Sequence, residues 1–232
     1  MLKTPLHAWH TANGGKLIDF GGWDMPVQYA SGILKEHLAT RRYGGLFDVS
    51  HMGRFRICGK DTVPFLQHVL TNNAESLEPW QAQYTLIPNE NGGLLDDAYL
   101  YHPGNEYFLV VNASNREKDW NHFQEQAKAF AVNLEDETDQ VAMIAFQGPL
   151  SGRILSEVKR NGAMPETFRN SLSAMTILGT KVLVARTGYT GEPLGFELFA
   201  PADKVASCRW LSRTRASRAK EIRCIATDSK SG

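Results

Sequence analysis

Two adjacent aspartates, Asp96 and Asp97, lie inside a segment that otherwise has the character of a β-strand. The segment 94–101 reads LLDDAYLY after the turn sequence NENGG, and strands rarely accept aspartate. Because side chains alternate between the faces of a strand, the two carboxylates are expected on opposite faces and not as an acid/base pair. Asp97 would share its face with Tyr99 and Tyr101, where a carboxylate can accept N–H hydrogen bonds. Two exposed carboxylates at a fraying strand end are the alternative.

A glycine-rich loop and the strand that follows it, residues 186–198 (RTGYTGEPLGFEL), form the second candidate. Three glycines let the backbone approach a ligand closely, but their spacing is not that of a phosphate-binding loop. Tyr189 offers a ring for stacking, and Glu197 is an acid between two apolar strand residues. A carboxylate can accept two parallel N–H bonds, which the amidine-like edge of a pterin would donate. An outward-facing strand glutamate is the alternative.

Other polar side chains give weaker signals. No G-x-S-x-G motif is present in the sequence, so a serine-hydrolase elbow is not indicated. Asp48, Ser50 and His51 are too close in sequence to be identified as a triad, and a local turn network is expected. His7 and His10 are expected on a surface helix and not in a metal site. The 3 cysteines are far apart and form no C-x-x-C motif, which predicts neither a disulfide framework nor a zinc site.

The composition is that of an ordinary globular protein. Of the 232 residues, 42% are hydrophobic and 22% are charged. The formal net charge is +0, which gives no overall field that would gather nucleic acid. The sequence has no run of about 18 apolar residues, so no membrane span is expected. The first residues have neither signal-peptide nor transit-peptide character, and the protein is expected to be cytoplasmic.

Periodicity predicts the elements that position these residues. Apolar spacing predicts a helix over 31–45, and alternation predicts a single strand over 46–57. The middle of the chain predicts strand, helix, three strands, helix and strand, at 53–58, 61–71, 82–88, 94–101, 106–112, 114–130 and 131–135. The second of these helices opens with a capping box of Ser114 and Glu117. This is the ferredoxin-like order with one extra strand.

The pattern restarts after the polar stretch 136–140. A strand, a helix and two strands joined by a glycine-rich loop are predicted at 141–149, 150–160 and 181–200. The restart indicates that the middle unit is inserted into another domain.

We therefore expect an α+β fold. Residues 1–52 and 136–204 would form an antiparallel-sheet first domain that binds the ligand, and residues 53–135 an inserted ferredoxin-like domain. Residues 205–232 are rich in Arg and Ser without a clear apolar face, and they are expected to form an atypical tail.

Six stretches together resemble the T-protein family of the glycine cleavage system, whose members are aminomethyltransferases. They are DFGGWDMPVQY (19–29), GLFDVSHMGRF (45–55), NENGGLLDDAYLY (89–101), LVVNASNREKD (109–119), AFQGP (145–149) and RTGYTGEPLGFEL (186–198). The resemblance is collinear from about residue 3 to 204. The combination is specific, although AFQGP alone would not be.

The resemblance implies a reaction of one-carbon metabolism and glycine catabolism. The family removes the aminomethyl group from the lipoyl arm of the H-protein, releases ammonia and passes the one-carbon unit to tetrahydrofolate, which lies in a channel between domains. It implies that Asp97 is the catalytic carboxylate, which supports iminium-like positive charge, and that Glu197 binds the pterin. The folate pocket would be lined by Tyr84, Tyr101, Asn112 and Tyr189, with Met52 nearby.

The resemblance also implies a three-part architecture, with a barrel-like third domain. The family's third domain, and the arginine-bearing segment before it, are not recognised here, so the chain resembles a C-terminally truncated T-protein. The alternatives are a non-catalytic folate-binding relative of the kind that assists iron–sulfur maintenance, an inactive truncated fragment, and a relative that acts on another methylated substrate. The resemblance implies no metal and no nucleic-acid or membrane partner.

Overall fold

The computed structural model describes residues 1–206 and 222–225. The chain divides into two compact units. The first contains Met1–His51, Asp139–Arg169 and the described part of Ser173–Gly232, and the second contains Met52–Thr138 and Asn170–Leu172. Within the described residues, no helix has the length and apolar character needed to cross a membrane.

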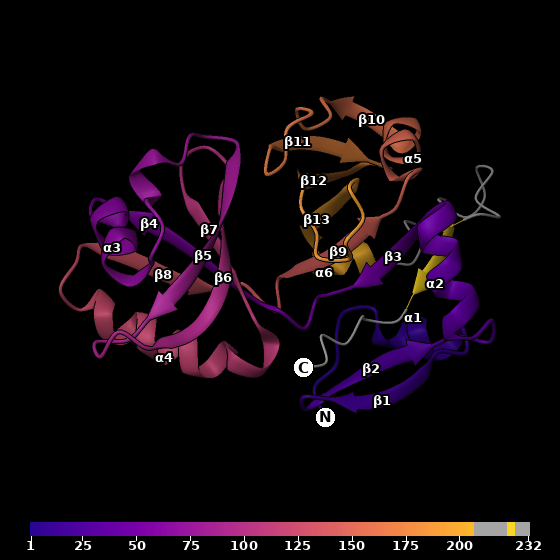
Figure 1. Cartoon of the computed structure of the whole chain (residues 1–232), viewed down its shortest axis with the longest axis horizontal. Coiled ribbons are helices and arrows are strands. Elements are labelled where there is room, and N and C mark those ends of the chain that lie inside the picture. Colours follow the sequence, from indigo (N-terminus) through magenta and orange to yellow (C-terminus); the bar gives the residue numbers. More distant parts are fainter. Residues whose placement is uncertain (207–221, 226–232) are drawn as a thin grey trace. The chain divides into compact units, whose positions relative to one another are not determined.

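The second unit is an antiparallel sheet with the order β5-β6-β7-β4-β8 and two helices (Figure 1). Its elements are β4 (Gly53–Gly59), α3 (Thr62–Val69), the 3₁₀ turn η1 (Ala74–Ser76), β5 (Gln81–Pro88), β6 (Leu94–His102), β7 (Tyr107–Val111), the 3₁₀ turn η2 (Ala113–Asn115), α4 (Arg116–Ala127) and β8 (Val132–Asp136). The order β8-β4-β7-β6 is that of a ferredoxin-like sheet, and β5 is the added strand at its edge. The predicted ferredoxin-like order with one extra strand is therefore confirmed.

The core of the second unit lies on one face of this sheet. Strand side chains such as Phe55 and Leu100 pack there with Phe65 of α3 and Phe123 of α4, and all four are buried. Burying a side chain of this size contributes about 1.5–3 kcal/mol. Ala98 and Leu100 belong to this core, so the predicted alternation of β6 is confirmed.

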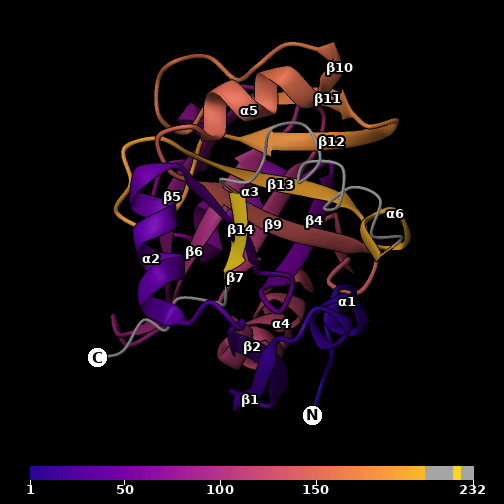
Figure 2. The same ribbon diagram turned by 90° about the vertical axis from the view of Figure 1, so that its right-hand side faces the viewer.

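The first unit contains a seven-stranded sheet with the order β10-β11-β12-β13-β9-β3-β14 and a separate β1–β2 hairpin. Strand β14 runs parallel to β3, and β3 pairs antiparallel with β9. Strands β9, β13 and β12 lie side by side, and each pairs antiparallel with the next (Figure 2). Its elements are α1 (His7–Ala12), β1 (Lys16–Phe20), β2 (Trp23–Gln28), α2 (Ile33–Arg42), β3 (Gly44–Asp48), β9 (Val141–Gln147), α5 (Ser151–Val158), β10 (Lys159–Gly162), β11 (Leu172–Ile177), β12 (Thr180–Ala185), β13 (Gly195–Pro201), α6 (Ala202–Ala206) and β14 (Ile222–Ile225).

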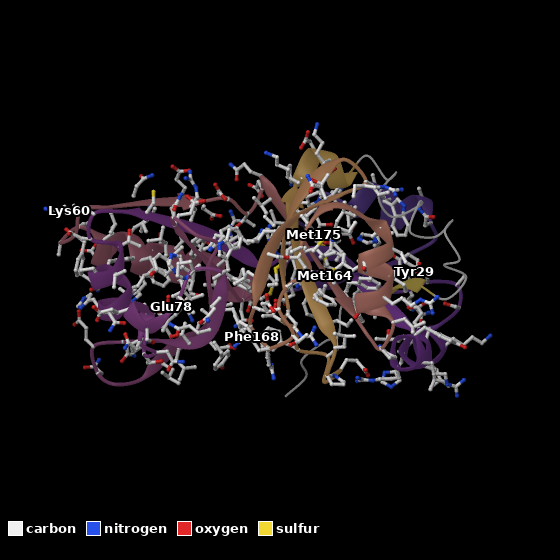
Figure 3. All side chains as sticks on the ribbon, turned by 90° about the horizontal axis from the view of Figure 1, so that it is seen from above. Tyr29, Lys60, Glu78, Met164, Phe168 and Met175 are labelled. Atoms are coloured by element: carbon white, nitrogen blue, oxygen red, sulfur yellow. The ribbon has the colours of Figure 1, made fainter. Side chains whose placement is uncertain are left out.

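The core of the first unit uses alternate residues of its central strands. Phe146 of β9 and Phe196 and Leu198 of β13 are buried in it. Met175 is part of this core, and Met164 packs against it (Figure 3). The odd-numbered residues of β13, including Glu197, therefore point to the opposite face of the sheet.

The single strand predicted over 46–57 is wrong. The segment is divided between β3 and β4, which belong to different sheets. The physical reason is a local turn, since the Asp48 carboxylate accepts a hydrogen bond of 3.0 Å from the Ser50 backbone N–H. The turn network expected at this position is thereby confirmed.

Two further differences concern element ends. The predicted capping box of Ser114 and Glu117 does not start the second helix, because residues 113–115 form the 3₁₀ turn η2 and α4 begins at Arg116. The tail expected from residue 205 lies largely outside the described residues. The described part includes the end of α6 and strand β14, which adds to the edge of the first unit's sheet beside β3.

Candidate functional site

The Asp97 carboxylate is held by an amide from the neighbouring strand. Ala98 pairs with Val111, so the antiparallel register places Asn112 opposite Asp97. The Nδ2 group of Asn112 donates to Oδ1 of Asp97 at 2.7 Å, and it lies 3.3 Å from the Asp97 backbone oxygen. Asp97 is half-buried at this end of β6. One carboxylate oxygen is thus fixed in orientation.

The same amide also binds Asp96. Its Nδ2 group donates to Oδ1 of Asp96 at 2.9 Å, so two carboxylates share one donor group. The two carboxylates, which alternation predicts on opposite faces, therefore meet at one amide and are not independent. We name Asp96, Asp97, Asn112 and Asp119 the acidic cluster. Asp96 is half-buried, so the alternative of two solvent-exposed carboxylates does not hold.

Asp119, in the first turn of α4, completes the acidic cluster and is fully buried. A helix N-terminus stabilises a negative charge by about 0.3–1 kcal/mol. Burial, the hydrogen-bonding contact with Asp96 and the charge of Asp96 have the opposite effect, because they favour the protonated form of Asp119. Together they raise the pKa of Asp119 from 3.8 to about 8. Since one pKa unit corresponds to about 1.4 kcal/mol, burial outweighs the helix terminus. In the sequence, Asp119 is only the last residue of the segment NREKD, and no role was predicted for it.

The aromatic residues predicted for this site differ in accessibility. Tyr84 on edge strand β5 is 42% exposed and pairs across the strands with Tyr99, their rings 6.1 Å apart. Burial, followed by the charge and a hydrogen bond of Asp97, raises the pKa of Tyr84. Tyr101 is fully buried with its ring 5.4 Å from that of Tyr99. The half-buried Met52 accepts a hydrogen bond from Arg54 through its backbone oxygen. The structure therefore brings Asp97, Asn112 and Tyr84 together.

Glu197 lies on the central strand β13 of the first unit. It pairs with Ala185 of β12 on one side and with Ala145 of β9 on the other. Only 3% of Glu197 is exposed, so the alternative of an outward-facing glutamate is wrong. The Thr187 hydroxyl donates a short hydrogen bond to Oε2 of Glu197. A buried carboxylate requires such a partner, because burial of an unpaired charge is costly.

Gln147, at the end of β9, explains why the loop before Glu197 is rich in glycine. Its buried amide donates from Nε2 to the backbone oxygens of Thr187 and Phe196 at 3.2 and 3.1 Å. A Cβ atom at Gly188 or at Gly195 would lie 2.1 Å from Oε1 of Gln147. The glutamine amide therefore occupies the space that the missing side chains leave. We name Gln147, Thr187, Glu197 and loop 188–195 the glutamate site.

Gln147 and Thr187 were both missed by sequence reasoning, although both stand inside the quoted motifs. The signal in the sequence was a polar residue at the end of a buried strand.

Tyr189, in the same loop, has 46% of its surface exposed, and the loop backbone carries positive φ angles of 153° at Gly188 and 77° at Gly191.

The prediction of His10 on a surface helix is wrong. His10 is buried, and its Nε2 and Nδ1 atoms lie 2.9 Å from Asp48 Oδ2 and 2.5 Å from the Tyr29 hydroxyl. Burial alone would raise the pKa of Asp48, but hydrogen bonds from His10, Thr4 and Ser50 and the charge of His10 lower it. This network joins α1 to β3 within the first unit.

Within the described residues, no group of three His, Cys, Asp or Glu side chains is arranged to hold a metal ion.

The chain is similar in sequence to proteins named aminomethyltransferase. An aminomethyltransferase from Deinococcus deserti is 48% identical over 203 residues, which cover 87% of this chain and 56% of that protein. An aminomethyltransferase from Prosthecochloris aestuarii is 45% identical over 231 residues, which cover 97% of this chain and 62% of that protein. The chain thus spans a little more than half the length of these curated relatives.

Two solved structures share the fold. The crystal structure of glycine cleavage system aminomethyltransferase T from Bartonella henselae has a TM-score of 0.84 and 30% identity, and the match covers 97% of this chain and 59% of that chain. A heterotetrameric sarcosine oxidase from Corynebacterium sp. U-96 has a TM-score of 0.59 at 13% identity, covering 81% of this chain and 92% of that chain, which shows a similar fold only.

The family comparison covers almost the whole sequence. The family described as "GCVT N-terminal domain" matches residues 6–230, so the match extends beyond residue 204, where we expected the resemblance to end. Taken with the aminomethyltransferase relatives, this match shows that the chain belongs to the GCVT N-terminal domain family, that of the glycine cleavage system T-proteins.

Proposed function

We propose that this protein acts in the transfer of an aminomethyl-derived one-carbon unit to tetrahydrofolate in the glycine cleavage system, with release of ammonia. The observation that carries the proposal is the half-buried Asp97 carboxylate, oriented by the Asn112 amide beside the half-exposed Tyr84. The names of the relatives support this reaction class. Asp97 and Glu197 belong to different units, so each role is argued and tested separately.

Asp97 is the proposed catalytic carboxylate. When ammonia leaves an aminomethyl group, positive charge develops on the carbon and its neighbouring heteroatom. A fixed carboxylate stabilises that charge without having to reorient, and it can also accept a proton. The Asn112 amide binds Oδ1 of Asp97, which supports a fixed orientation of the carboxylate for this role.

Glu197 is the proposed pterin-binding residue. A carboxylate on a rigid central strand can accept parallel N–H bonds from an amidine-like edge. The short bond from Thr187 and the packing of Gln147 against the glycines support a fixed orientation. The proposal assigns further folate contacts to Tyr189, Tyr84, Tyr101, Asn112 and Met52.

The proposed donor is the H-protein, which carries the aminomethyl group on its lipoyl arm. The proposed compartment is the cytoplasm, where a free thiol such as Cys58 stays reduced. The domain boundaries 1–52 with 136–204, and 53–135, remain part of the proposal.

The test is release of ammonia from aminomethyl-loaded H-protein in the presence of tetrahydrofolate. Asp97→Asn should lower the rate roughly 10²–10⁴-fold, because the amide cannot stabilise positive charge or accept a proton. Asp139→Asn, at an exposed aspartate of the first unit, is the matched control and should leave the rate unchanged. An equal rate for Asp97→Asn and wild type would reject the assignment. Folate binding without ammonia release by wild type would instead favour the non-catalytic folate-binding alternative.

A further inference from the structure

The acidic cluster contains carboxyl oxygens that lack a hydrogen-bond donor. Both side-chain oxygens of Asp119 and Oδ2 of Asp96 are buried, and no N–H or O–H donor from the described residues serves them. Oδ1 of Asp96 is already used by Asn112. Buried polar groups in native proteins nearly always have partners, so three such oxygens in one place require a physical account.

A shared proton supplies the missing donor. An ionised carboxylate can only accept hydrogen bonds, whereas a protonated carboxyl group has one O–H to donate. Asp119 and Asp96 contact each other, and this contact raises the pKa of Asp119 because it favours the protonated form. Two buried carboxyl groups in contact cannot both remain ionised without strong repulsion. One proton held between them removes the repulsion and serves two of the three buried oxygens, one on each residue.

The remaining charged groups around Asp119 do not replace this proton. Asp97, also on β6, adds negative charge, and Lys118, on α4 itself, adds positive charge that favours ionisation. The Lys118 Nζ group is occupied by the backbone oxygen of Leu95, to which it donates at 2.6 Å. Burial and Asp96 are the larger influences, and they favour protonation.

We infer that Asp119 is a positioning residue that shares a proton with Asp96 and, through Asp96 and Asn112, fixes the orientation of the Asp97 carboxylate. The chain of contacts is continuous. Asp119 contacts Asp96, Oδ1 of Asp96 accepts from Asn112 at 2.9 Å, and the same Nδ2 donates to Asp97 at 2.7 Å. Loss of the proton would give Asp96 a repelling neighbour and draw the Asn112 amide toward Asp96, away from Asp97. The consequence for catalysis rests on the proposed function.

Side-chain amide NMR of Asn112 tests the network without any substrate. In wild type, the Asn112 Nδ2 signal should shift in one step between pH 6 and 10. Asp119→Asn, which keeps a donor but cannot ionise, should abolish the step. Glu117→Gln, at an exposed acid of the same helix, should leave it intact. A signal that stays constant in wild type, or an identical step in Asp119→Asn, would overturn the inference.

The pH profile of ammonia release tests the effect on Asp97. Wild-type kcat should fall on the alkaline side of the step, while Asp119→Asn should keep its kcat there and Glu117→Gln should follow wild type. Asp119→Ala, which removes the donor, should lower kcat about tenfold at pH 7. The same alkaline fall in Asp119→Asn would contradict the positioning role. If the Asn112 signal of wild type shifted with pH but wild type released no ammonia, the transferase proposal would be rejected. The shared proton would still be supported in that case.

Discussion

Both candidate acids are strand carboxylates, but the acidic cluster and the glutamate site stabilise them differently. Glu197 lies on a central strand with backbone pairing on both sides, and it has the Thr187 hydroxyl as a donor. Asp97 lies near a strand end and shares its amide donor with Asp96. Among the described residues, Asp119 has no donor at all other than a carboxyl proton.

The difference shows two ways to stabilise a carboxyl group on a β-strand. At the glutamate site the Thr187 hydroxyl and the Gln147 amide do not titrate near neutral pH, so the contacts that they donate should be independent of pH. In the acidic cluster the acceptors outnumber the donors, so the geometry depends on a bound proton.

The largest expected effect is on the pH dependence of stability. The folded-state pKa of Asp119 is raised from 3.8 to about 8, so its contribution to stability is fully present below about pH 4 and is lost as the pH rises to about 8. This single group should lower the free energy of unfolding by up to about 1.4 kcal/mol per pH unit within that window. Asp119→Asn should remove this slope. Urea denaturation at several pH values would measure it, and an unchanged slope would argue against the buried proton.

Breaking the glutamate site should come next. Gly188→Ala should lower the free energy of unfolding by about 3 kcal/mol, because a Cβ would overlap the Gln147 amide and the φ angle of 153° is unfavourable for alanine. Gly191→Ala is the matched control. Its φ is also positive, but no described atom lies within 4 Å of the added Cβ, so only about 1 kcal/mol should be lost. Equal losses for both variants would mean that the contact with Gln147 does not matter.

Removing the Thr187 hydroxyl, which donates to Glu197, should have a smaller effect. Thr187→Val keeps the volume and removes the hydroxyl, and loss of a charge-assisted bond should lower the free energy of unfolding by about 2 kcal/mol. Thr190→Val removes two neutral bonds, the one of 3.1 Å to Gln147 and the one of 3.4 Å from the Glu192 backbone N–H, and should cost about 1 kcal/mol. Chemical denaturation at pH 7 compares the two. If Thr187→Val cost no more than Thr190→Val, the Thr187–Glu197 bond would not be the stronger one.

The smallest effect is expected at Tyr84. Its hydroxyl interacts with Asp97, but 42% of the residue is exposed, and solvent screens the interaction. Tyr84→Phe should therefore change the free energy of unfolding by less than about 0.5 kcal/mol. A much larger loss in thermal denaturation would show that this contact supports the acidic cluster more strongly than its exposure indicates.

The sequence predicted most of what depends on periodicity. The alternation of Ala98 and Leu100 in β6 follows from a two-residue repeat, and the ferredoxin-like order follows from the succession of strand and helix patterns. The burial of His10 and the position of the Gln147 amide could not be predicted in this way, because each depends on contacts between distant parts of the chain. Asp119 shows the same limit, since its neighbour Asp96 is 23 positions earlier and becomes a partner only when α4 packs on the sheet.

Tetrahydrofolate protection against heat tests most directly whether the two carboxylates have separate tasks. At about 100 times its dissociation constant, a ligand adds about 2.7 kcal/mol, which for a protein of this size corresponds to roughly 5–10 °C in Tm. We predict this shift for wild type and Asp97→Asn, and its loss in Glu197→Gln. No shift in wild type, or a full shift in Glu197→Gln, would contradict the assignment of folate binding to Glu197.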